Sequence, residues 1–381
     1  MTRTALTGAR LFDGERFHDG MAVVIANGRI EKVVSQRELD GSIERTHLAG
    51  GVLATGFIDA QVNGGGGVLL NEKPSVATIR RMAEAYRIFG TTSLLPTVIT
   101  DRTDIIREAA EAVAQARREN VPGVIGIHIE GPFLDPRRRG AHPPEHIRSM
   151  TPADIAWLKG LDCGIVLLTV APSHVSPADI RELAQSGIIV SLGHSEATAV
   201  EANAALAAGA RGFTHLYNAM SQLQNREPGM VGAALIDAAS YCGLIADGHH
   251  VDPLALKVAL AAKRKGHLFL VTDAMPPAAG GPPSFELQGR KVMARNGRLE
   301  LADGTLAGSI LTMDMALRYC VEKLGLDLAE ALRMAALYPA TFLRLERELG
   351  RIAPGYRANL VHLTDDLAVT ATWIDGDKSP S

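Results

Sequence analysis

The sequence predicts an α/β protein: a (β/α)₈ TIM barrel with a small β-sandwich domain built from both termini. Three observations support this prediction. The chain is 381 residues long, which suits one large barrel with an appendage. Its middle alternates apolar strand candidates with amphipathic helical stretches, whereas both ends have the pattern of short strands and turns. We expect the β domain over residues 1–51 and 350–381, and the barrel over residues 52–349.

The barrel prediction rests on eight apolar segments in the middle of the chain. Near-continuous apolar strands separated by helices are typical of parallel strands that are buried on both faces. Helix candidates lie between many of them, at 78–89, 104–118, 197–208 and 253–265. An open doubly wound sheet is the alternative, but the GxGxxG fingerprint that would favour it is absent after the first strand. The eight strand candidates are Val52–Val62, Ser93–Thr97, Val124–Ile129, Ile165–Val170, Ile188–Leu192, Gly212–Leu216, Gly243–Ala246 and Leu268–Thr272.

The β domain is predicted from short strand patterns at the two ends of the chain. Asn27-Gly28 stands between alternating apolar residues, and this dipeptide is a strong hairpin signal. A similar texture returns after the Pro354-Gly355 turn, so one domain built from both termini is expected. The strand candidates are Thr4–Leu11, Met21–Ile25 and Ile30–Val34 at the start, and Asn359–Leu363 and Val369–Ile374 at the end.

Composition and charge exclude several classes of protein. The formal net charge is −3 and aromatic residues make up 4% of the chain, whereas a nucleic-acid footprint needs clustered Lys and Arg with interleaved aromatics. The densest basic cluster, Arg137–Arg139, is typical of a solvated loop. No apolar run approaches the roughly 20 residues of a membrane span. We therefore expect no nucleic-acid partner and no membrane association.

Cysteine usage and the first residues bear on the cellular compartment. Cys163, Cys242 and Cys320 are too few and too scattered for a disulfide framework or a Cys-rich zinc site. Cys163 and Cys242 stand beside apolar runs, which indicates buried thiols. The start of the chain has no long apolar stretch behind a basic segment, as a signal peptide would. We expect a cytoplasmic protein.

Polar and titratable side chains follow six of the eight strand candidates at the same end. The active site of a TIM barrel lies at the carboxyl ends of its strands. A single histidine after a strand is more often structural, but six such coincidences at one end of one barrel indicate an active site. The six segments are Asp59–Asn63, His128–Pro132, Gly193–Ser195, His215–Asn218, Asp247–His250 and Thr272–Ala274.

One carboxylate and two imidazoles from three of these strand ends form a candidate metal site. Glu130, His194 and His215 make up a set similar to that of a catalytic zinc site, in which three protein ligands leave a position for water. Such a metal lowers the pKa of bound water towards neutrality and makes it a usable nucleophile. We expect one divalent metal ion per subunit, with Zn²⁺ favoured.

Asp273 and His142 are the candidate catalytic residues. Asp273 could accept a proton from the attacking water and deliver it to the leaving nitrogen. Its alternative role is a helix N-cap, which Pro276-Pro277 so soon afterwards disfavours. His142 lies on the long loop after the third strand and could donate a hydrogen bond to a scissile carbonyl, with a solvated loop histidine as the alternative.

Arg226 and His250 are candidates for holding an anionic group. Arginine makes bidentate, charge-assisted hydrogen bonds to phosphate. For Arg226 taken alone, a surface salt bridge is the better interpretation, and its role as a ligand depends on the rest of the site.

Eight segments together resemble the N-acetylglucosamine-6-phosphate deacetylases of the amidohydrolase superfamily. They cover nearly the whole chain in consistent order, and HLYNAM with HIEGPFL is specific to this family. The segments are QVNGGGG (61–67), HIEGPFL (128–134), GAH (140–142), GHS (193–195), THLYNAM (214–220), DGHH (247–250), TDAM (272–275) and LAGS (306–309).

The resemblance implies hydrolysis of N-acetylglucosamine 6-phosphate to glucosamine 6-phosphate and acetate, with Asp273 as general acid/base. It implies a homo-oligomer, usually a homodimer but also a higher one, in which some phosphate contacts arise at or across the subunit interface. A deacetylase of another phosphorylated N-acetyl amino sugar, such as the galactosamine epimer, remains an alternative, as does a non-catalytic barrel that binds a ligand. The implied metal ligands are Glu130, His194 and His215. The implied substrate contacts are Ala141, His142, Asn218, Ala219, Arg226, Asp247, Gly248, His249, His250, Leu306, Ala307 and Gly308.

Two positions depart from the pattern of the superfamily. Most members have His-x-His at the end of the first strand, where this chain has Gln61-Val62-Asn63. Amide oxygens are poorer ligands for a borderline-soft ion such as Zn²⁺, so a single tightly held ion is expected and the two amides should act as hydrogen-bonding groups. Ser173 stands where the family's Ala-Pro-Glu triplet would have Glu, which leaves that loop's contacts open.

Overall fold

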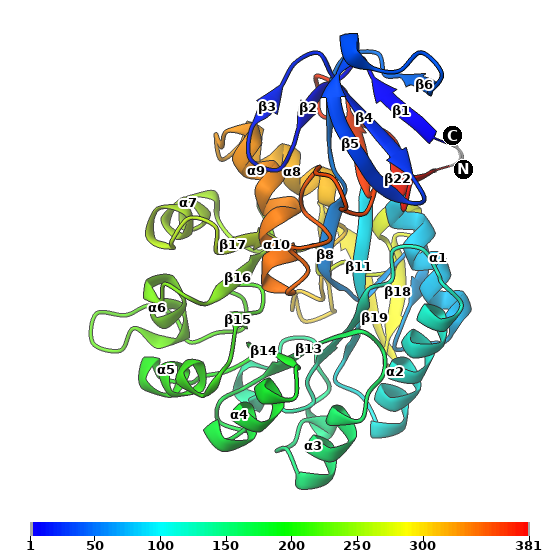
Figure 1. Cartoon of the computed structure of the whole chain (residues 1–381). Helices are drawn as coiled ribbons and strands as arrows, with labels where there is room; N and C mark the ends of the chain where they lie inside the picture. The colour runs from blue at the N-terminus through cyan, green and yellow to red at the C-terminus, as the bar shows by residue number, and fades with distance from the viewer. Residues whose placement is uncertain (1–2, 380–381) are drawn as a thin grey trace.

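The computed structural model describes residues 3–379 of the chain. Eight parallel strands of the middle segment form one sheet in sequence order (Figure 1). A parallel bridge between Val62 and Ala274 joins the last strand region to the first, and the Asp273 amide donates a 2.9 Å hydrogen bond to the Gln61 carbonyl. The predicted barrel is confirmed over the open sheet. Its strands are β8 (Phe57–Val62), β11 (Thr91–Ile99), β12 (Gly126–Glu130), β13 (Ile165–Val170), β14 (Ile189–Leu192), β15 (Gly212–Phe213), β16 (Tyr241–Leu244) and β17 (Leu268–Leu270).

Helices cover the outside of the barrel (Figure 1). Three of them begin with a capping box, in which the side chains of a Thr or Ser N-cap and of an acidic residue three positions later each accept a hydrogen bond from the other's backbone amide. The pairs are Thr151 with Asp154, Ser176 with Asp179, and Thr198 with Glu201. The helices are α1 (Val76–Arg87), α2 (Thr103–Arg118), α3 (Pro152–Lys159), α4 (Pro177–Gln185), α5 (Ala199–Ala208), α6 (Gly229–Ile236), α7 (Pro253–Ala262), α8 (Met313–Glu322), α9 (Leu328–Ala335) and α10 (Leu337–Phe342).

Strands from both ends of the chain form two further sheets, which fit a small β-sandwich domain (Figure 1). Apolar side chains of both sheets, including Leu6, Val23 and Trp373, share one buried core. One sheet has the order β5 (Arg29–Ser35), β4 (Met21–Ala26), β1 (Arg3–Thr7), β6 (Glu44–His47). The other has the order β23 (Asp377–Lys378), β22 (Val369–Ile374), β21 (Leu360–Leu363), β7 (Val52–Thr55), β2 (Arg10–Phe12), β3 (Phe17–His18).

Two predicted strands are each divided in the structure. The segment predicted as one strand over Val52–Val62 is β7, which pairs with β2 and β21 of the terminal sheet, followed by β8 of the barrel. Gly56 separates them, and a Cβ there would lie 2.1 Å from the Thr92 side chain. The segment Thr4–Leu11 divides at Gly8, where φ is +93°, a value that glycine adopts without steric cost. In both cases a glycine lets the chain change direction between sheets.

A three-stranded sheet inserted after the last barrel strand was not predicted. It consists of β18 (Ser284–Leu287), β19 (Arg290–Arg295) and β20 (Arg298–Glu300). Its turns, Gln288-Gly289 and Asn296-Gly297, have φ > 0 at both residues, the geometry of tight type I′ hairpins. The Asn-Gly pair is the sequence signal that could have revealed it. A short hairpin of β9 (Gly64–Gly65) and β10 (Val68–Leu69) follows β8 in the chain.

Within residues 3–379, no helix combines the length and apolar character that crossing a membrane requires. Cys163, Cys242 and Cys320 are buried and unpaired, as was predicted for the first two.

Candidate active site

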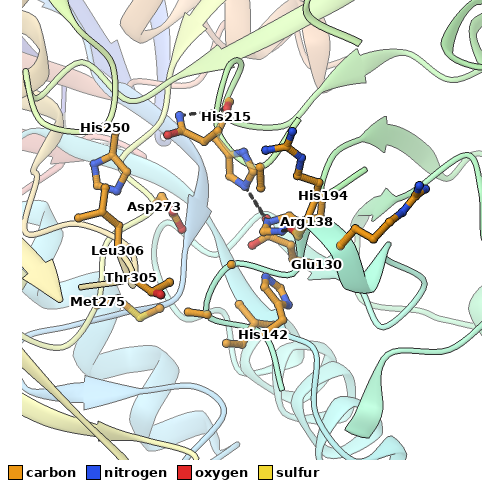
Figure 2. Close-up of a pocket in the computed structure, with 17 residues that line it drawn as sticks. Glu130, Arg138, His142, His194, His215, His250, Asp273, Met275, Thr305 and Leu306 are labelled. Carbon is orange, nitrogen blue, oxygen red and sulfur yellow. Dashed lines mark hydrogen bonds and ion pairs between the residues drawn. The ribbon is translucent and has the colours of Figure 1, made fainter. Parts of the chain in front are cut away.

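A cavity of about 410 Å³ opens at the carboxyl ends of the barrel strands. Its volume lies within the range of small-molecule sites, about 300–1,000 Å³. In the view of Figure 2, Glu130, His194 and His215 gather on one side of Asp273 and His250 lies on the other. Five of the six strand ends singled out in the sequence therefore line one space. The first does not line it but adjoins it, because Gln61 and Asn63 hydrogen-bond Asp273.

Glu130, His194 and His215 converge on a common point in this cavity (Figure 2). Glu130 Oε1 lies 3.0 Å from His215 Nε2 and 3.2 Å from His194 Nε2, and the two Nε2 atoms are 3.0 Å apart. All three side chains are buried, and their ligand atoms lie within 4.8 Å of one another. The structure brings the predicted ligand set together from three separate strands.

The protonation states of these groups fit a divalent cation. His194 Nδ1 lies 2.9 Å from the Arg138 carbonyl oxygen, which can only accept. The ring therefore carries its proton on Nδ1 and leaves Nε2 bare, as in metal-ligating histidines with a carbonyl partner. Burial raises the pKa of Glu130, but its contacts with the two imidazoles outweigh this effect and hold that pKa well below its usual range. The carboxylate is anionic, and a cation would complete the site.

The backbone turns sharply where these side chains leave their strands. His194, His215 and Asp273 all have positive φ, at +46°, +35° and +51°. This left-handed region is sparsely populated by residues other than glycine, and such strain clusters at functional sites. Ala219, a predicted sugar contact, shares the feature at +50°. The tight turns aim the ends of three strands, β14, β15 and β17, into the same cavity.

Asp273 is buried against the metal-ligand cluster and is held by two amides. Asn63 Nδ2 donates a 2.6 Å hydrogen bond to Asp273 Oδ1. Gln61 Nε2 donates to the same oxygen at 3.2 Å and to Glu130 Oε2 at 3.1 Å. Burial raises the pKa of Asp273 to about 6, with the negative charge of Glu130 as the next cause. A carboxyl with a pKa near neutrality suits a group that both accepts and returns a proton.

Asp59 belongs to the first strand-end segment named from the sequence, which gave it no role, and it supports Asp273 through Thr272. Thr272 donates to its carboxylate from Oγ1 at 2.5 Å and from its backbone amide at 3.2 Å. Because Thr272 precedes Asp273, these bonds fix the end of the eighth strand to the first. Burial raises the pKa of Asp59 to about 7.

His142 lies in the cavity wall with its ring buried. The ring packs edge-on against that of His194, with centroids 4.4 Å apart. Its Nδ1 faces Thr100, whose Oγ1 is 2.8 Å away and whose backbone amide donates to it at 3.3 Å. It is therefore an ordered side chain of the cavity wall, and the alternative of a solvated loop histidine is excluded.

The predicted substrate contacts divide into residues that line this cavity and residues that do not. Ala141, Asn218, Ala219, His250, Leu306 and Gly308 line it, together with His142. Asp247 stands behind, where its carboxylate accepts from the backbone amides of His249 and His250 and lies 2.6 Å from His250 Nδ1. Gly248, His249 and Ala307 are likewise outside the lining, and Ala307 is buried beside it. Arg226 is exposed on the loop before α6 and does not line the cavity of its own chain.

Sequence reasoning missed two arginines in the cavity wall. Arg137 and Arg138 both line it, although their cluster was predicted to be a solvated loop. Arg138 is half-buried and paired with Glu196, and Arg137 is paired with Asp135 at 2.6 Å. Their position just before the Gly-Ala-His segment was the available signal.

Comparisons with known proteins agree with this architecture. The chain matches the Amidohydrolase family over residues 52–378 and the NagA composite domain over residues 4–53. It is 45% identical to N-acetylgalactosamine-6-phosphate deacetylase of Shewanella sp. (strain ANA-3), over 97% of this chain and 94% of that protein. It is 39% identical to N-acetylglucosamine-6-phosphate deacetylase of Haemophilus influenzae, over 93% of each. The crystal structure of N-acetylglucosamine-6-phosphate deacetylase from Pasteurella multocida superposes with a TM-score of 0.97 at 34% identity, over 100% of both chains. The chain belongs to the amidohydrolase family.

Proposed function

We propose that this protein deacetylates N-acetylglucosamine 6-phosphate to glucosamine 6-phosphate and acetate. The observation that carries the proposal is the convergence of Glu130, His194 and His215 beside the buried Asp273 in one cavity of substrate size. Two imidazoles and one carboxylate are a common ligand set of catalytic zinc, so Zn²⁺ is the proposed ion, one per subunit. When bound there, such an ion supplies Lewis-acid activation of water and of the acetyl carbonyl.

The residues of the chain divide the remaining work. Asp273 accepts a proton from the attacking water through its carboxylate and returns it to the leaving nitrogen, for which a pKa raised to about 6 is suited. His142 donates a hydrogen bond from Nε2 to the acetyl oxygen as negative charge develops on it. Ala141, Asn218 and Ala219 contact the sugar, and His250 faces the phosphate end of the cavity.

A second copy of the chain completes the phosphate site in this proposal. Arg226 is exposed and outside its own cavity, so it serves the cavity of a partner subunit. Helices α5, α6 and α7 lie on one side of the barrel (Figure 1). Large apolar side chains are exposed on these helices and on the loop before α6. Exposed apolar surface of this kind is typical of interfaces. The exposed residues are Val200 at 76%, Leu223 at 55%, Ile236 at 81%, Leu254 at 73% and Val258 at 52%. We propose a homodimer through this face.

N-acetylgalactosamine 6-phosphate is the second candidate substrate. It is favoured by one observation, the 45% identity to the Shewanella enzyme named for that sugar. The two sugars differ in the configuration of a single ring hydroxyl, and the same metal, acid/base and phosphate groups would act on both.

We place the protein in the cytoplasm, where thiols stay reduced. Three buried, unpaired cysteines support this. The strands of the two termini and the barrel are proposed to be separate domains, over residues 1–51 with 350–381 and over 52–349. The pairing of β7 (Val52–Thr55) with β2 and β21 moves the first boundary past Thr55, because β7 belongs to the terminal sheet.

The deciding experiment measures release of free amine from four sugars: both 6-phosphorylated epimers and both unphosphorylated forms. The proposal expects the highest kcat/KM with N-acetylglucosamine 6-phosphate, and loss of activity after metal chelation that Zn²⁺ restores. A higher kcat/KM with the galactosamine epimer selects the second candidate. If metal-loaded protein releases no amine from either phosphorylated sugar, both candidate substrates are refuted. Asp273→Asn protein serves as the blank.

A further inference from the structure

Gln288, in the turn between β18 and β19, and Arg290, the first residue of β19, contact two backbone segments next to His142. Gln288 Nε2 donates a 2.7 Å hydrogen bond to the carbonyl oxygen of Thr100. Arg290 Nη2 donates to the carbonyl oxygen of Ala141. Thr100 is the residue that faces the His142 ring, and Ala141 precedes His142 in the chain. Two side chains of the inserted sheet thus hold the two segments that determine where this imidazole lies.

Thr100 determines which nitrogen of the His142 ring can donate. The Thr100 backbone amide donates to Nδ1 at 3.3 Å, and a backbone amide can only be a donor. Nδ1 is therefore an acceptor in the neutral ring, and the ring proton is on Nε2. The Thr100 hydroxyl lies 2.8 Å from the same nitrogen. This arrangement leaves the Nε2–H free to point at a substrate oxygen.

Gln288 is itself held in one orientation. Its Nε2 also donates to Asp101 Oδ2 at 2.9 Å, and that oxygen accepts a 2.9 Å bond from Asn71 Nδ2. Asn71 in turn exchanges hydrogen bonds with the backbone of Ile99, at 3.0 Å and 3.1 Å. The turn is tied to the end of β11 by a continuous polar network.

Apolar packing joins the same parts. Leu287, Val292 and Leu299 of the inserted sheet share a small buried core with Ile99 and Ala141. The sheet therefore forms a rigid backing for the loop that bears His142. Hydrogen bonds from buried or half-buried donors on such a backing fix a side chain more closely than a loop alone does.

We propose that Gln288 and Arg290 are positioning residues for the reaction: by holding the carbonyls of Thr100 and Ala141, they orient the His142 imidazole with Nε2–H towards the substrate. This inference rests on the proposed function, in which that Nε2–H contacts the acetyl oxygen. Neither side chain needs to touch the substrate, and their contribution passes through His142.

The kinetic test is a double-mutant cycle between Arg290→Met and His142→Ala in the metal-loaded full chain. Arg290→Met should lower kcat about ten- to 100-fold, the effect of misplacing a catalytic group by about 1 Å, while KM changes less than about threefold. In the His142→Ala background the same substitution should change kcat less than about twofold, because its effect passes through the missing ring. Arg290→Lys, which keeps one donor, should recover part of the lost kcat. Equal losses in both backgrounds, or no loss in either, would overturn the inference.

The matched control is Lys291→Met, at the exposed neighbour of Arg290 on β19, which should leave kcat unchanged.

A second measurement does not depend on turnover. In protein with ¹⁵N-labelled histidine, the His142 Nδ1 signal, assigned by its loss in His142→Ala, should be that of an unprotonated nitrogen. It should move towards a mixture of tautomers in a Gln288→Leu/Arg290→Met double variant and stay in place in Lys291→Met. If the His142 Nδ1 signal is unchanged in the double variant, the inference is contradicted, whatever the substrate of the enzyme is. If the wild-type chain shows no turnover of the proposed substrate, only the proposed function is refuted.

Discussion

Asn63 donates a 2.6 Å hydrogen bond from Nδ2 to Oδ1 of Asp273, and so links the end of the first barrel strand to the end of the eighth. Gln61 does the same from Nε2 and bridges to Glu130. In both residues the amide NH₂ group faces the carboxylates. An NH₂ group has hydrogens and no ligand lone pair to offer a cation. The two residues that replace a His-x-His pair therefore take the hydrogen-bonding role that the sequence predicted for them.

We expect one tightly held divalent ion per chain. A second ion would have to displace the amide hydrogens of Gln61 and Asn63 from Asp273 and Glu130, and amide oxygens are weak ligands for Zn²⁺. Elemental analysis of protein dialysed against metal-free buffer, with anomalous diffraction at the zinc edge, measures the number. Two fully occupied ions that are both required for turnover would contradict this prediction without touching the deacetylase assignment.

Asp273→Asn should lower kcat by roughly 10²–10⁴, the usual contribution of a positioned general acid/base, while folding and metal content stay nearly unchanged. Asp273 must be ionised to accept a proton, so activity should fall as pH falls through its pKa. That pKa is raised to about 6 by burial, and a bound cation nearby lowers it. The acid limb of kcat/KM should thus lie at or below about pH 6. Near-normal turnover by the variant would refute the assignment.

Asn63→Leu should move that acid limb to higher pH. The hydrogen bond from Asn63 stabilises the ionised form of Asp273 and lowers its pKa, so its loss raises the pKa and the carboxylate protonates earlier as pH falls. At pH 8 the carboxylate is ionised in both proteins, and kcat should differ much less there than at pH 6. The measurement is the pH profile of kcat/KM for the two proteins. An acid limb that stays in place or moves to lower pH in Asn63→Leu argues against the role given to Asn63.

Arg226→Ala should lower kcat/KM for the phosphorylated sugar about ten- to 150-fold, the loss of one hydrogen bond to a charged group. With the unphosphorylated sugar the penalty should largely vanish.

If Arg226 serves the partner's cavity, mixing Arg226→Ala with Asp273→Asn subunits creates hybrid dimers with one intact site. Random exchange should then restore about a quarter of the wild-type activity, since half of the dimers are hybrids with one working site each. Mixtures no more active than their parents would place Arg226 in its own cavity or outside both.

Asp154 should make stability depend on pH in the acid range. Burial raises its pKa, but the bidentate Arg148 guanidinium and two donors of Thr151 outweigh this and bring the pKa to about 2, below its usual 3.8. A lowered carboxyl pKa contributes stability above pH 4, and this contribution is lost as pH falls towards 2. The difference in unfolding free energy between wild type and Asp154→Asn should therefore shrink over that window in chemical denaturation.

Asp179→Asn is the matched control for that measurement. Asp179 occupies the same capping position in α4 and bonds Ser176, and no guanidinium pairs with it among residues 3–379. Its substitution therefore removes the same capping hydrogen bonds without removing an ion pair. A difference for Asp154→Asn that grows as pH falls would reverse the sign predicted here.

The central chemistry of the site could be predicted from the sequence because it follows strand ends. Glu130, His194, His215 and Asp273 each come directly after an apolar run, and parallel strands of a barrel bring their carboxyl ends to one face. The structure places all four together. His142 was predicted from its loop in the same way. Local patterns of this kind need no knowledge of long-range contacts.

Other features depend on contacts between distant segments, and only the tertiary structure decides them. A glycine between two apolar runs does not by itself show that the chain leaves one sheet for another, as it does at Gly56, because the close approach of Thr92 is a long-range contact. The exposure of Arg226 and the partial burial of Arg138 likewise depend on how loops fold over the barrel.

The backing of His142 shows the physical reason most plainly. Gln288 and Arg290 bond backbone carbonyls of residues more than 140 positions away, and every residue carries a carbonyl, so the sequence holds no mark of which one is used. Side-chain identity and periodicity determine the barrel, the candidate ligand set and the proposed acid/base residue. Which backbone groups those side chains meet is determined by the packing of the inserted sheet against the barrel, because that packing alone sets the distances between them.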